Sequence, residues 1–416
     1  MAQNDIYGSK ERYEKFLANL NDITKKPKSK KRIYYCKNPG NILYFQKLAG
    51  HFEMKNISYI RRVRMFHVLK LLTYVTEKNL EKFDRDDINK MVAYGHTTHK
   101  TINSKRDFIK DLKCMWRVLF PERDHQARVD ETLTPYVVRH LSRKIDRSKE
   151  KRRNDKLTWE EFQKLLNFFS EDEQMQAYLM FSVESLGRPQ EILYTKIRDY
   201  EFHDNFARVM ISEHGKEGTG VLQCIDSYPY IVEWYRKHPL KDDPNAFFFI
   251  NKGKRKCHEQ LKNNNINGRL RHALKLLAIN KSVTCYSLKR NGVTFARLRG
   301  DSDLDIQHRA RWTSTKQLKI YDMSTQEDAF KLELQKRGLG ITEDGKQQTS
   351  ATKTCQFCET VNGFTAEFCN TCKRPLDRKK IQEMAEFSDD MVNNQLFQRF
   401  ARLEKMFERV VDRKTI

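Results

Sequence analysis

The sequence has no long hydrophobic run. No apolar stretch approaches the roughly 18 residues that cross a bilayer, and the first residues, Met-Ala-Gln-Asn-Asp-Ile-Tyr, lack the apolar segment of a signal peptide. Carboxylates are also in short supply: 55 Asp and Glu residues face 79 Lys and Arg residues, so the formal net charge is +24. These absences predict a soluble, cytoplasmic protein without a membrane partner, and the excess of cations predicts a polyanionic partner.

Disorder is not the main feature of this chain, because hydrophobic residues make up 38% and aromatic residues 11% of it. Its 416 residues are enough for two or three domains, each with its own core. Five of its nine cysteines are scattered singly, and we expect buried thiols in a reducing compartment without a structural disulfide. These five are Cys36, Cys114, Cys224, Cys257 and Cys285.

Periodicity and charge divide the chain into five segments. A charged linker without apolar periodicity separates a helical region with basic outer faces from a mixed α+β region. In the mixed region Thr158 is a predicted helix N-cap, a helix is expected at 174–187, and strands at 206–213 and 220–225 flank a glycine-rich turn. The segments are a basic arm (1–35), a helical domain (36–145), an α+β domain (155–345), a cysteine module (352–376) and a C-terminal helix (377–416).

The C-terminal segment carries one apolar stripe. Its members follow one another by four and three residues, which is the spacing of a coiled-coil seam. The stripe predicts a helix for self-association or docking, while an amphipathic helix that packs on its own protein fits the pattern equally well. The stripe consists of Leu396, Phe400, Leu403, Phe407 and Val410.

The other four cysteines form two Cys-x-x-Cys pairs with a spacer of ten residues between them: Cys355 with Cys358, and Cys369 with Cys372. Four thiolates at this spacing suit tetrahedral Zn²⁺ in a closed, and therefore structural, site. A thioredoxin-like redox pair would need a βαβ context, which the surrounding sequence lacks. The pattern predicts a zinc ribbon that contacts DNA, contacts another protomer or anchors the C-terminal helix.

Tyr321 is the candidate nucleophile. A phenol is a poor nucleophile at its free pKa of about 10, so a catalytic Tyr needs cationic neighbours that stabilise charge on the group it attacks. The sequence supplies such cations upstream, in Arg188, Lys216 and the adjacent pair Lys289 and Arg290. Together with the net positive charge, these residues predict a DNA strand-transfer site.

Four anchors, which are three motifs and one lysine at a turn, carry a resemblance to a known family in the order in which they occur. Arg188 is followed three residues later by a Glu in Ser-Leu-Gly-Arg-Pro-Gln-Glu, and Lys216 follows a Gly at a turn. The stretch Tyr-Ser-Leu-Lys begins at Tyr286, and Tyr321 comes nine residues after Trp312. In these motifs and intervals the α+β domain resembles the tyrosine recombinase (phage integrase) family. The cysteine module makes the chain similar to the archaeal type of this family, which has a C-terminal zinc ribbon.

The resemblance implies a mostly α-helical protein with a helical core-binding domain on DNA, an α+β catalytic domain, a small zinc ribbon and a C-terminal helix. It implies a site-specific recombinase or integrase that cleaves and rejoins double-stranded DNA through a 3′-phosphotyrosyl intermediate, without a catalytic cofactor or a small-molecule substrate. Arg188 would bind non-bridging phosphate oxygens, Lys216 would protonate the leaving 5′-oxygen, and Trp312 would donate its indole N–H. Family members act as four protomers, so a homo-oligomer on DNA is also implied.

The second motif, which begins at Tyr286, departs from the family pattern. Tyr286 stands where His or Lys is usual, and Lys289 stands where a second Arg is expected. Either Lys289 serves without the bidentate fork of Arg, or a small shift brings in Arg290. Arg309 and Arg311 are further candidates to compensate. Two alternatives stay open: a non-catalytic DNA-binding protein derived from the recombinase fold, and a type IB topoisomerase-like enzyme that nicks and closes DNA.

Overall fold

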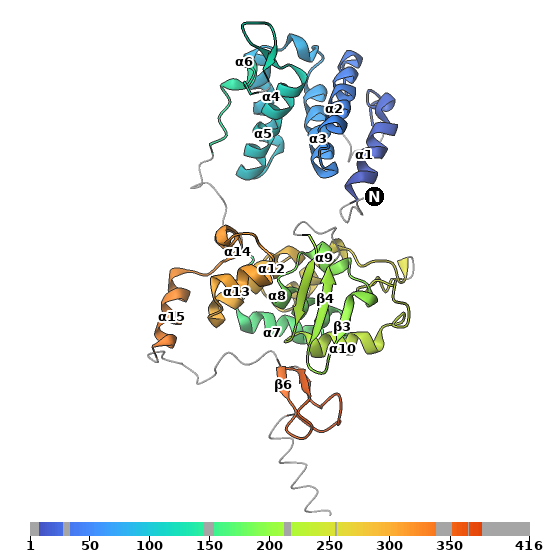
Figure 1. Cartoon of the computed structure of the whole chain (residues 1–416), viewed down its shortest axis with the longest axis vertical. Coiled ribbons are helices and arrows are strands. Elements are labelled where there is room, and N and C mark those ends of the chain that lie inside the picture. The colour runs from blue at the N-terminus through green and yellow to red at the C-terminus, as the bar shows by residue number, and fades with distance from the viewer. Residues whose placement is uncertain are drawn as a thin grey trace, which may run out of the picture. The chain divides into compact units, whose positions relative to one another are not determined.

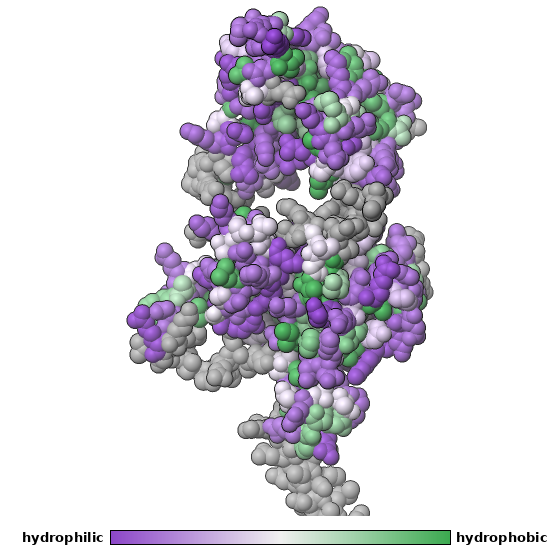
Figure 2. Space-filling view, viewed as in Figure 1, coloured by the Kyte–Doolittle hydropathy of each residue, from purple (hydrophilic) through white to green (hydrophobic). Residues whose placement is uncertain are grey.

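The computed structural model describes residues 8–27, 34–130, 132–144, 154–211, 218–253, 256–337, 352–364 and 366–376. The chain forms two compact units, Met1–Arg152 and Arg153–Ile416 (Figure 1). Hydrophilic side chains cover most of the visible surface of each unit (Figure 2). The predicted C-terminal helix and the turn with Lys216 lie outside the described residues. None of the helices described is long and apolar enough to cross a membrane.

The N-terminal unit is a group of helices with one short β-hairpin. Side-chain caps fix the start of two helices: Asp84 accepts a hydrogen bond from the Asp87 backbone N–H, and Thr101 accepts one from Ser104. The helices are α1 (Ser9–Ala18), α2 (Ile42–Met54), α3 (Tyr59–Val75), α4 (Arg85–Thr98), α5 (Ile102–Leu119) and α6 (Tyr136–Arg139), and the hairpin pairs β1 (Glu122–Arg123) with β2 (Val129–Asp130).

Aromatic side chains fill the core of this unit. The Phe66 ring stacks on Tyr13 at a centroid distance of 5.4 Å and on Phe16 at 4.7 Å, so α1, which lies inside the predicted arm, packs against α3. The Phe108 ring of α5 packs against α4 at Gly95, where a Cβ atom would come within 2.4 Å of the ring. The glycine permits this close helix contact, and the buried rings supply the apolar area that stabilises the unit.

The C-terminal unit has a buried central helix. Helix α8 (Glu173–Ser185) is buried along most of its length and packs against α10 (Tyr228–Lys237) and α12 (Cys285–Arg299). Gly292 of α12 lies so close to the Val183 carbonyl of α8 that a Cβ atom would approach its oxygen to 2.2 Å. This close crossing brings the first and second sequence motifs onto neighbouring helices.

An antiparallel sheet in the order β3-β4-β5 lies beside these helices, formed by Tyr200–Phe202, Ala207–Ile211 and Gly220–Cys224. Residues of β4 are alternately buried and exposed, as expected for a sheet with one face on the core. The two strands predicted on either side of the glycine-rich turn are confirmed, as is the predicted helix that corresponds to α8.

The remaining helices complete the α+β domain. Thr158 begins α7 with a capping box: its side chain accepts from the Glu161 N–H, and the Glu161 carboxylate accepts from the Thr158 N–H, so the predicted N-cap is confirmed. The helices are α7 (Trp159–Phe168), α9 (Pro189–Leu193), α11 (Asn263–Leu276), α13 (Asp303–Arg309), α14 (Leu318–Tyr321) and α15 (Gln326–Lys336). The predicted fold class, mostly α-helical with an α+β domain, is confirmed.

The cysteine module contains a small antiparallel hairpin, β6 (Thr352–Thr354) and β7 (Val361–Gly363), followed by a second loop. Its cysteines and the five single ones are all free thiols. Three of the single cysteines are buried as expected, whereas Cys114 is half-buried and Cys257 is exposed. The burial preference of cysteine therefore predicts the environment of three of these five thiols correctly and that of the other two incorrectly.

Candidate active site

The first motif lies at a sharp turn between α8 and α9. Leu186 ends α8 in the left-handed region (φ 53°), and a Cβ atom on Gly187 would come within 2.9 Å of the Ile192 side chain, so the chain reverses at a glycine. Arg188 then caps α9, with Pro189 at the first helical position, where the missing N–H is not needed. This turn leaves Arg188 8% exposed.

The Glu191 carboxylate, three residues after Arg188, stabilises this turn. Its Oε2 accepts a hydrogen bond from the Arg188 backbone N–H at 3.0 Å, and its Oε1 lies 3.5 Å from Arg188 Nη1. The same carboxylate accepts a 2.6 Å hydrogen bond from Nη2 of Arg311, the residue before Trp312. One buried carboxylate therefore joins the first motif to the third.

The second motif lies in the first turns of α12. Neighbouring residues of an α-helix point about 100° apart, and Lys289 and Arg290 have different partners for this reason. The Lys289 ammonium lies 5.4 Å from the ring centroids of both Trp312 and Tyr321. Arg290 instead forms a buried ion pair with Asp155. Of these two cations, Lys289 is the one that reaches Tyr321.

Asp155 explains the orientation of Arg290. Its Oδ2 also accepts a 2.8 Å hydrogen bond from Ser287, and its backbone carbonyl accepts a 2.9 Å bond from the Asn291 side chain. Asn291 Oδ1 accepts a 2.7 Å bond from the Leu157 N–H. These bonds tie the beginning of the α+β domain to one face of α12. Neither Asp155 nor Asn291 is a predicted site residue, because a lone carboxylate or amide carries no motif signal.

The third motif brings Trp312 and Tyr321 together. Tyr321 is the last residue of α14, and its half-buried ring lies 5.1 Å from the Trp312 ring at an interplanar angle of 36°. Trp312 is 6% exposed, and its indole Nε1 is buried without a hydrogen-bond partner among the described residues. A buried donor without a protein partner is uncommon and marks a position where a ligand oxygen can bind.

Besides Arg188 and Arg290, whose described ion pairs are with Glu191 and Asp155, two more predicted site residues are not seen beside Tyr321. Tyr286 is 44% exposed, and its hydroxyl donates to the Gln190 side chain, next to the first motif. Lys216 and its turn lie outside the described residues. After this turn the described chain resumes at Gly218, at the start of the next strand segment.

Arg309 and Arg311 have different surroundings although they are close in sequence. Arg309 Nη2 donates to Asp301 Oδ2 at 2.6 Å. Arg311 bridges Glu191 and the Gly218 carbonyl, to which its Nη1 donates at 3.0 Å. Of the two further candidates from the sequence, Arg311 is the one that adjoins the first motif.

Two other potential nucleophiles near the second motif are suppressed by burial. Burial raises the pKa of the Cys285 thiol, at the start of α12, to about 11. Burial also raises the pKa of the Tyr178 phenol well above its ordinary value. Burial therefore disfavours the charged thiolate and phenolate at these two positions.

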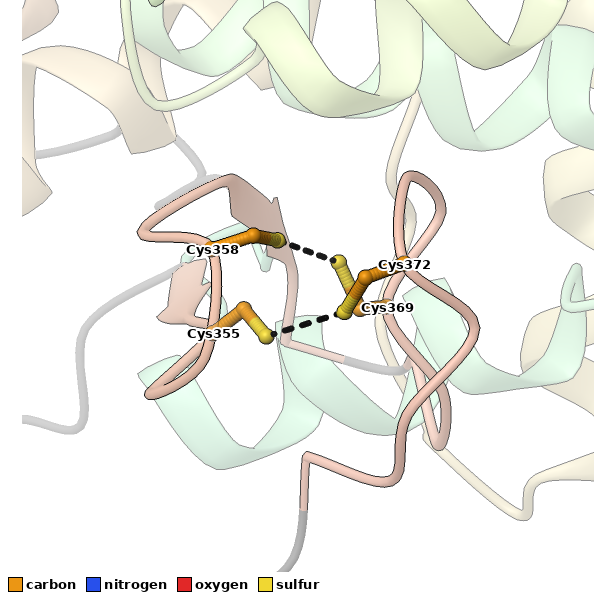
Figure 3. Close-up of side chains that lie close together, drawn as sticks. All are labelled: Cys355, Cys358, Cys369 and Cys372. Carbon is orange, nitrogen blue, oxygen red and sulfur yellow. Dashed lines mark hydrogen bonds between the residues drawn. The ribbon is translucent and has the colours of Figure 1, made fainter.

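The four cysteines of the cysteine module converge on one point (Figure 3). All four sulfur atoms lie within 4.8 Å of one another, and the Cys355–Cys372 and Cys358–Cys369 sulfur pairs are each 3.5 Å apart. A disulfide needs about 2.0 Å, whereas four thiolates bound to zinc at ~2.3 Å lie about 3.8 Å apart. The cluster fits a tetrahedral metal ion.

The cysteine module lies against α10 of the α+β domain. The Phe364 N–H donates to the Tyr230 hydroxyl at 3.0 Å, and Asn370 Nδ2 donates to Glu233 at 3.1 Å. A Cβ atom on Gly363 would approach the Tyr230 ring to 2.8 Å. The glycine permits this contact, so the module is attached by its own hydrogen bonds and packing in addition to its linker.

Comparisons with known proteins agree with this geometry. Residues 155–337 match the model described as the phage integrase family. The fold is similar to a XerH site-specific recombinase bound to palindromic difH substrate, with 13% identity, a TM-score of 0.54, and coverage of 80% of this chain and 96% of that chain. It is also similar to a lambda integrase dimer bound to a core site, with 15% identity and a TM-score of 0.52. This match covers 67% of this chain and 94% of that chain.

A third similar structure is the Tn1549 transposon integrase in complex with transposon right end DNA, with 13% identity, a TM-score of 0.51, and coverage of 71% of this chain and 99% of that chain. Among curated proteins no match is found for the sequence. Residues 155–337 therefore form a tyrosine recombinase domain of the phage integrase family.

Proposed function

We propose that this chain is a site-specific DNA recombinase, or integrase, in which Tyr321 cleaves and rejoins strands through a 3′-phosphotyrosyl intermediate. The family domain and the recombinase fold support the reaction class. The observation that carries the choice of nucleophile is the position of Lys289, which is 1% exposed and lies 5.4 Å from the ring centroids of Trp312 and Tyr321. The buried ammonium supplies positive charge beside the tyrosine that would attack a phosphate.

In the proposed step the Tyr321 oxygen bonds to the phosphorus of one DNA strand, and the phenol proton passes to water. The bond between phosphorus and the 5′-oxygen of the next nucleotide breaks, and that oxygen takes up a proton to become a free 5′-hydroxyl. The phosphotyrosyl ester replaces the phosphodiester, so the energy of the broken bond is retained. Attack by a 5′-hydroxyl in the reverse direction rejoins the strand.

Four side chains carry the charge and proton changes of this step. Arg188 binds two non-bridging oxygens with its planar guanidinium, and Lys289 supplies a point charge where the family usually has a second Arg. Trp312 donates its buried indole N–H to a phosphate oxygen. Lys216 protonates the departing 5′-oxygen as a general acid.

The departures in the second motif fit this scheme. Arg290, paired with Asp155, anchors α12 and so keeps Lys289 beside the nucleophile. Tyr286, whose hydroxyl donates to Gln190, connects the second motif to the first. Both residues serve as positioning residues in the proposed site.

The substrate in this proposal is double-stranded DNA. The net charge of +24 supports binding to the phosphate backbone, and binding weakens as salt rises because bound counterions are released. One similar structure is a lambda integrase dimer on a core site, and another is a lambda integrase tetramer bound to a Holliday junction. We extend this arrangement to the present chain as a homo-oligomer on DNA, with four protomers during strand exchange.

The cysteine module completes the proposal as a structural zinc ribbon. The four converging sulfur atoms support the binding of one Zn²⁺ per chain. The attachment of the module to α10 supports a bracing role on the recombinase domain. The same module is the feature by which the chain resembles the archaeal type of the family.

The test is covalent trapping on nicked duplexes. A nick just beyond the cleaved phosphate lets the short fragment with the free 5′-hydroxyl diffuse away, so the phosphotyrosyl adduct accumulates. Because the target sequence is unknown, a library of nicked duplexes with randomised flanks is used, and covalently bound DNA is captured under denaturing conditions. We expect an adduct that is lost in Tyr321→Phe and retained in Tyr235→Phe, a half-buried control tyrosine that stacks on Phe202 of β3.

The outcomes separate the alternatives. No adduct with any member of the library, despite binding to duplex DNA, contradicts the proposal and favours a non-catalytic DNA-binding protein. An adduct together with relaxation of a single supercoiled plasmid, but without exchange between two captured sites, favours a topoisomerase-like enzyme instead.

A further inference from the structure

Tyr321 ends a helix that is too short to hold it in place. Helix α14 has four residues, and a helix of this length depends on contacts with the rest of the domain. Its first residue, Leu318, is buried in a small apolar cluster that also contains Val293 and Ala296 of α12. The chain just before Tyr321 is therefore packed on α12, the helix that carries Lys289.

Thr294 of α12 attaches the chain just after Tyr321. Its Oγ1 accepts a hydrogen bond from the Met323 backbone N–H at 3.0 Å. The same hydroxyl donates to the Arg290 carbonyl, four residues earlier in α12, at 3.0 Å. A threonine inside a helix commonly makes this second bond, and it directs the hydroxyl proton away from Met323, so that a lone pair faces the Met323 N–H. Thr294 is fully buried.

Two other contacts near Tyr321 hold the chain less firmly. The Asp322 carboxylate accepts from the Ser324 N–H at 2.8 Å, which is a contact within the same segment. Further along, the Lys156 ammonium lies 2.5 Å from the Asp328 carboxylate, and these side chains are 31% and 24% exposed. Water and salt weaken an ion pair that is partly exposed. The buried bond to Thr294 is therefore the attachment on which the position of the Tyr321 backbone depends most.

We propose that Thr294 is a positioning residue for Tyr321: its hydroxyl holds the Met323 backbone on α12 and so keeps the phenol beside Lys289. Because Lys289 belongs to the same helix, a shift of Met323 away from α12 changes the separation between the ammonium and the Tyr321 ring, which is 5.4 Å to the ring centroid. The inference rests on the proposed function, which makes Tyr321 the nucleophile. Thr294 acts through the backbone and does not touch the substrate.

Thr294→Val tests the role of the hydroxyl. The variant keeps two branches at Cβ but leaves the Met323 N–H without its acceptor. We expect the rate of adduct formation at saturating protein to fall by about 100-fold, the cost of a group misplaced by about 1 Å. Thr294→Ser keeps the hydroxyl and should stay within about threefold of the wild type. A wild-type rate in Thr294→Val, or an equal loss in Thr294→Ser, overturns the inference.

The affinity for DNA separates positioning from a loss of structure. A misplaced nucleophile slows the step after binding, so Thr294→Val should bind the duplex as tightly as the wild type. Thr73→Val is the matched control, because Thr73 is also fully buried and its hydroxyl also donates to a carbonyl four residues earlier, that of Leu69, at 3.0 Å. Thr73 lies in α3 of the other unit, and its variant should keep the wild-type rate. An equal loss in this control overturns the inference.

A change of leaving group tests which half of the reaction Thr294 serves. In a duplex captured from the library, the 5′-oxygen at the cleaved phosphate is replaced by sulfur, which leaves without help from a general acid because a thiol is more acidic than an alcohol. The loss in Thr294→Val should be as large on this duplex as on the normal one. A loss that disappears with sulfur would mean that Thr294 serves protonation of the leaving group, and would overturn the inference.

A second pair of variants decides if Thr294→Val does not fold, which thermal unfolding shows. Thr294→Ser and Thr294→Cys differ in one atom, and the Cys sulfur is a much weaker acceptor than the Ser oxygen. We expect the Cys variant to be slower than the Ser variant by at least about tenfold. Equal rates in this pair overturn the inference.

The wild-type reaction distinguishes this inference from the proposed function. No adduct with the wild-type chain contradicts the proposed function and removes the basis of the inference with it. An adduct with the wild-type chain, and an equal rate in Thr294→Val, contradicts the inference alone.

Discussion

The two units of this protein bury positive charge in different ways. In the N-terminal unit, Arg62 is 6% exposed, and its guanidinium lies 5.2 Å from the Tyr13 ring centroid and 4.7 Å from that of Tyr59. Its Nε donates to the Ile57 carbonyl at 2.6 Å. Aromatic faces and a backbone carbonyl thus offset the cost of burial, and the charge stabilises the packing of this unit.

In the C-terminal unit, buried cations lie beside a carboxylate and a half-buried tyrosine. Arg188 and Arg311 share Glu191, and Lys289 lies beside Tyr321. A buried ammonium beside a phenol places positive charge where a phosphate can bind. The comparison teaches that burial of a cation alone does not mark a functional site; its position beside a reactive group does.

Metal removal is expected to have the largest effect, and only on the C-terminal unit. Cys369→Ser removes one of the four converging thiols, so the module should lose its metal ion and about 10 kcal/mol or more of folding free energy. The measurement is the metal content of the purified chain, with one ion expected per wild-type chain and none in the variant. Cys257→Ser, at an exposed single cysteine, is the control; equal metal loss in that control would contradict the assignment of the ligands.

Exchange of the buried cations for methionine tests the comparison between the units directly. Lys289→Met should slow adduct formation by about 10²–10³-fold, because it removes one group that stabilises the charged transition state. Arg62→Met should leave cleavage unchanged but lower the stability of the N-terminal unit by about 2 kcal/mol, since the Ile57 carbonyl loses its donor. Cleavage rates and calorimetric unfolding measure the two effects. Wild-type cleavage by folded Lys289→Met would contradict the role of Lys289.

Lys289→Arg tests whether the site needs the charge of Lys289 or its shape, and its expected effect on the rate of adduct formation is smaller. The variant keeps the positive charge and provides the residue that the family usually has, but the larger side chain must fit a fully buried position. We expect adduct formation within about tenfold of the wild type, a difference of about 1.4 kcal/mol in the barrier. A rate as low as that of Lys289→Met would mean that the shape of the Lys side chain, and not its charge, is what the site needs.

Removal of a helix cap is expected to have the smallest effect, and it tests whether the two units unfold independently of each other. Asp84→Ala removes the N-cap of α4 in the N-terminal unit, and Thr158→Ala removes the N-cap of α7 in the C-terminal unit. Each should cost roughly 1 kcal/mol and shift only the calorimetric transition of its own unit. Equal shifts of both transitions by either variant would show that the two units unfold together.

Local patterns predict much of this fold. The helix that corresponds to α8, the strands β4 and β5 and the N-cap Thr158 follow from periodicity, turn residues and capping, which depend on neighbours in the sequence. The convergence of the four cysteine sulfur atoms likewise follows from the spacing of these residues. These features need little information about tertiary structure.

Contacts between distant segments are what the sequence does not predict. Lys289 and Arg290 are adjacent, and the choice between them depends on Asp155, which lies more than one hundred residues earlier and pairs with Arg290. The hydrogen bond from Arg311 to Glu191 likewise joins segments that are 120 residues apart. A motif identifies the residue types of a site, but the direction of each side chain is set by its partner in the folded domain.

The most direct test of the account is the identity of the residue that carries trapped DNA. The covalent adduct from a nicked duplex is digested with protease and nuclease, and the modified peptide is sequenced by mass spectrometry. We predict a nucleotide linked through its 3′-phosphate to Tyr321 and to no other residue. A phosphate linked to a different side chain, or a trapped adduct that persists in Tyr321→Phe, would contradict the central claim.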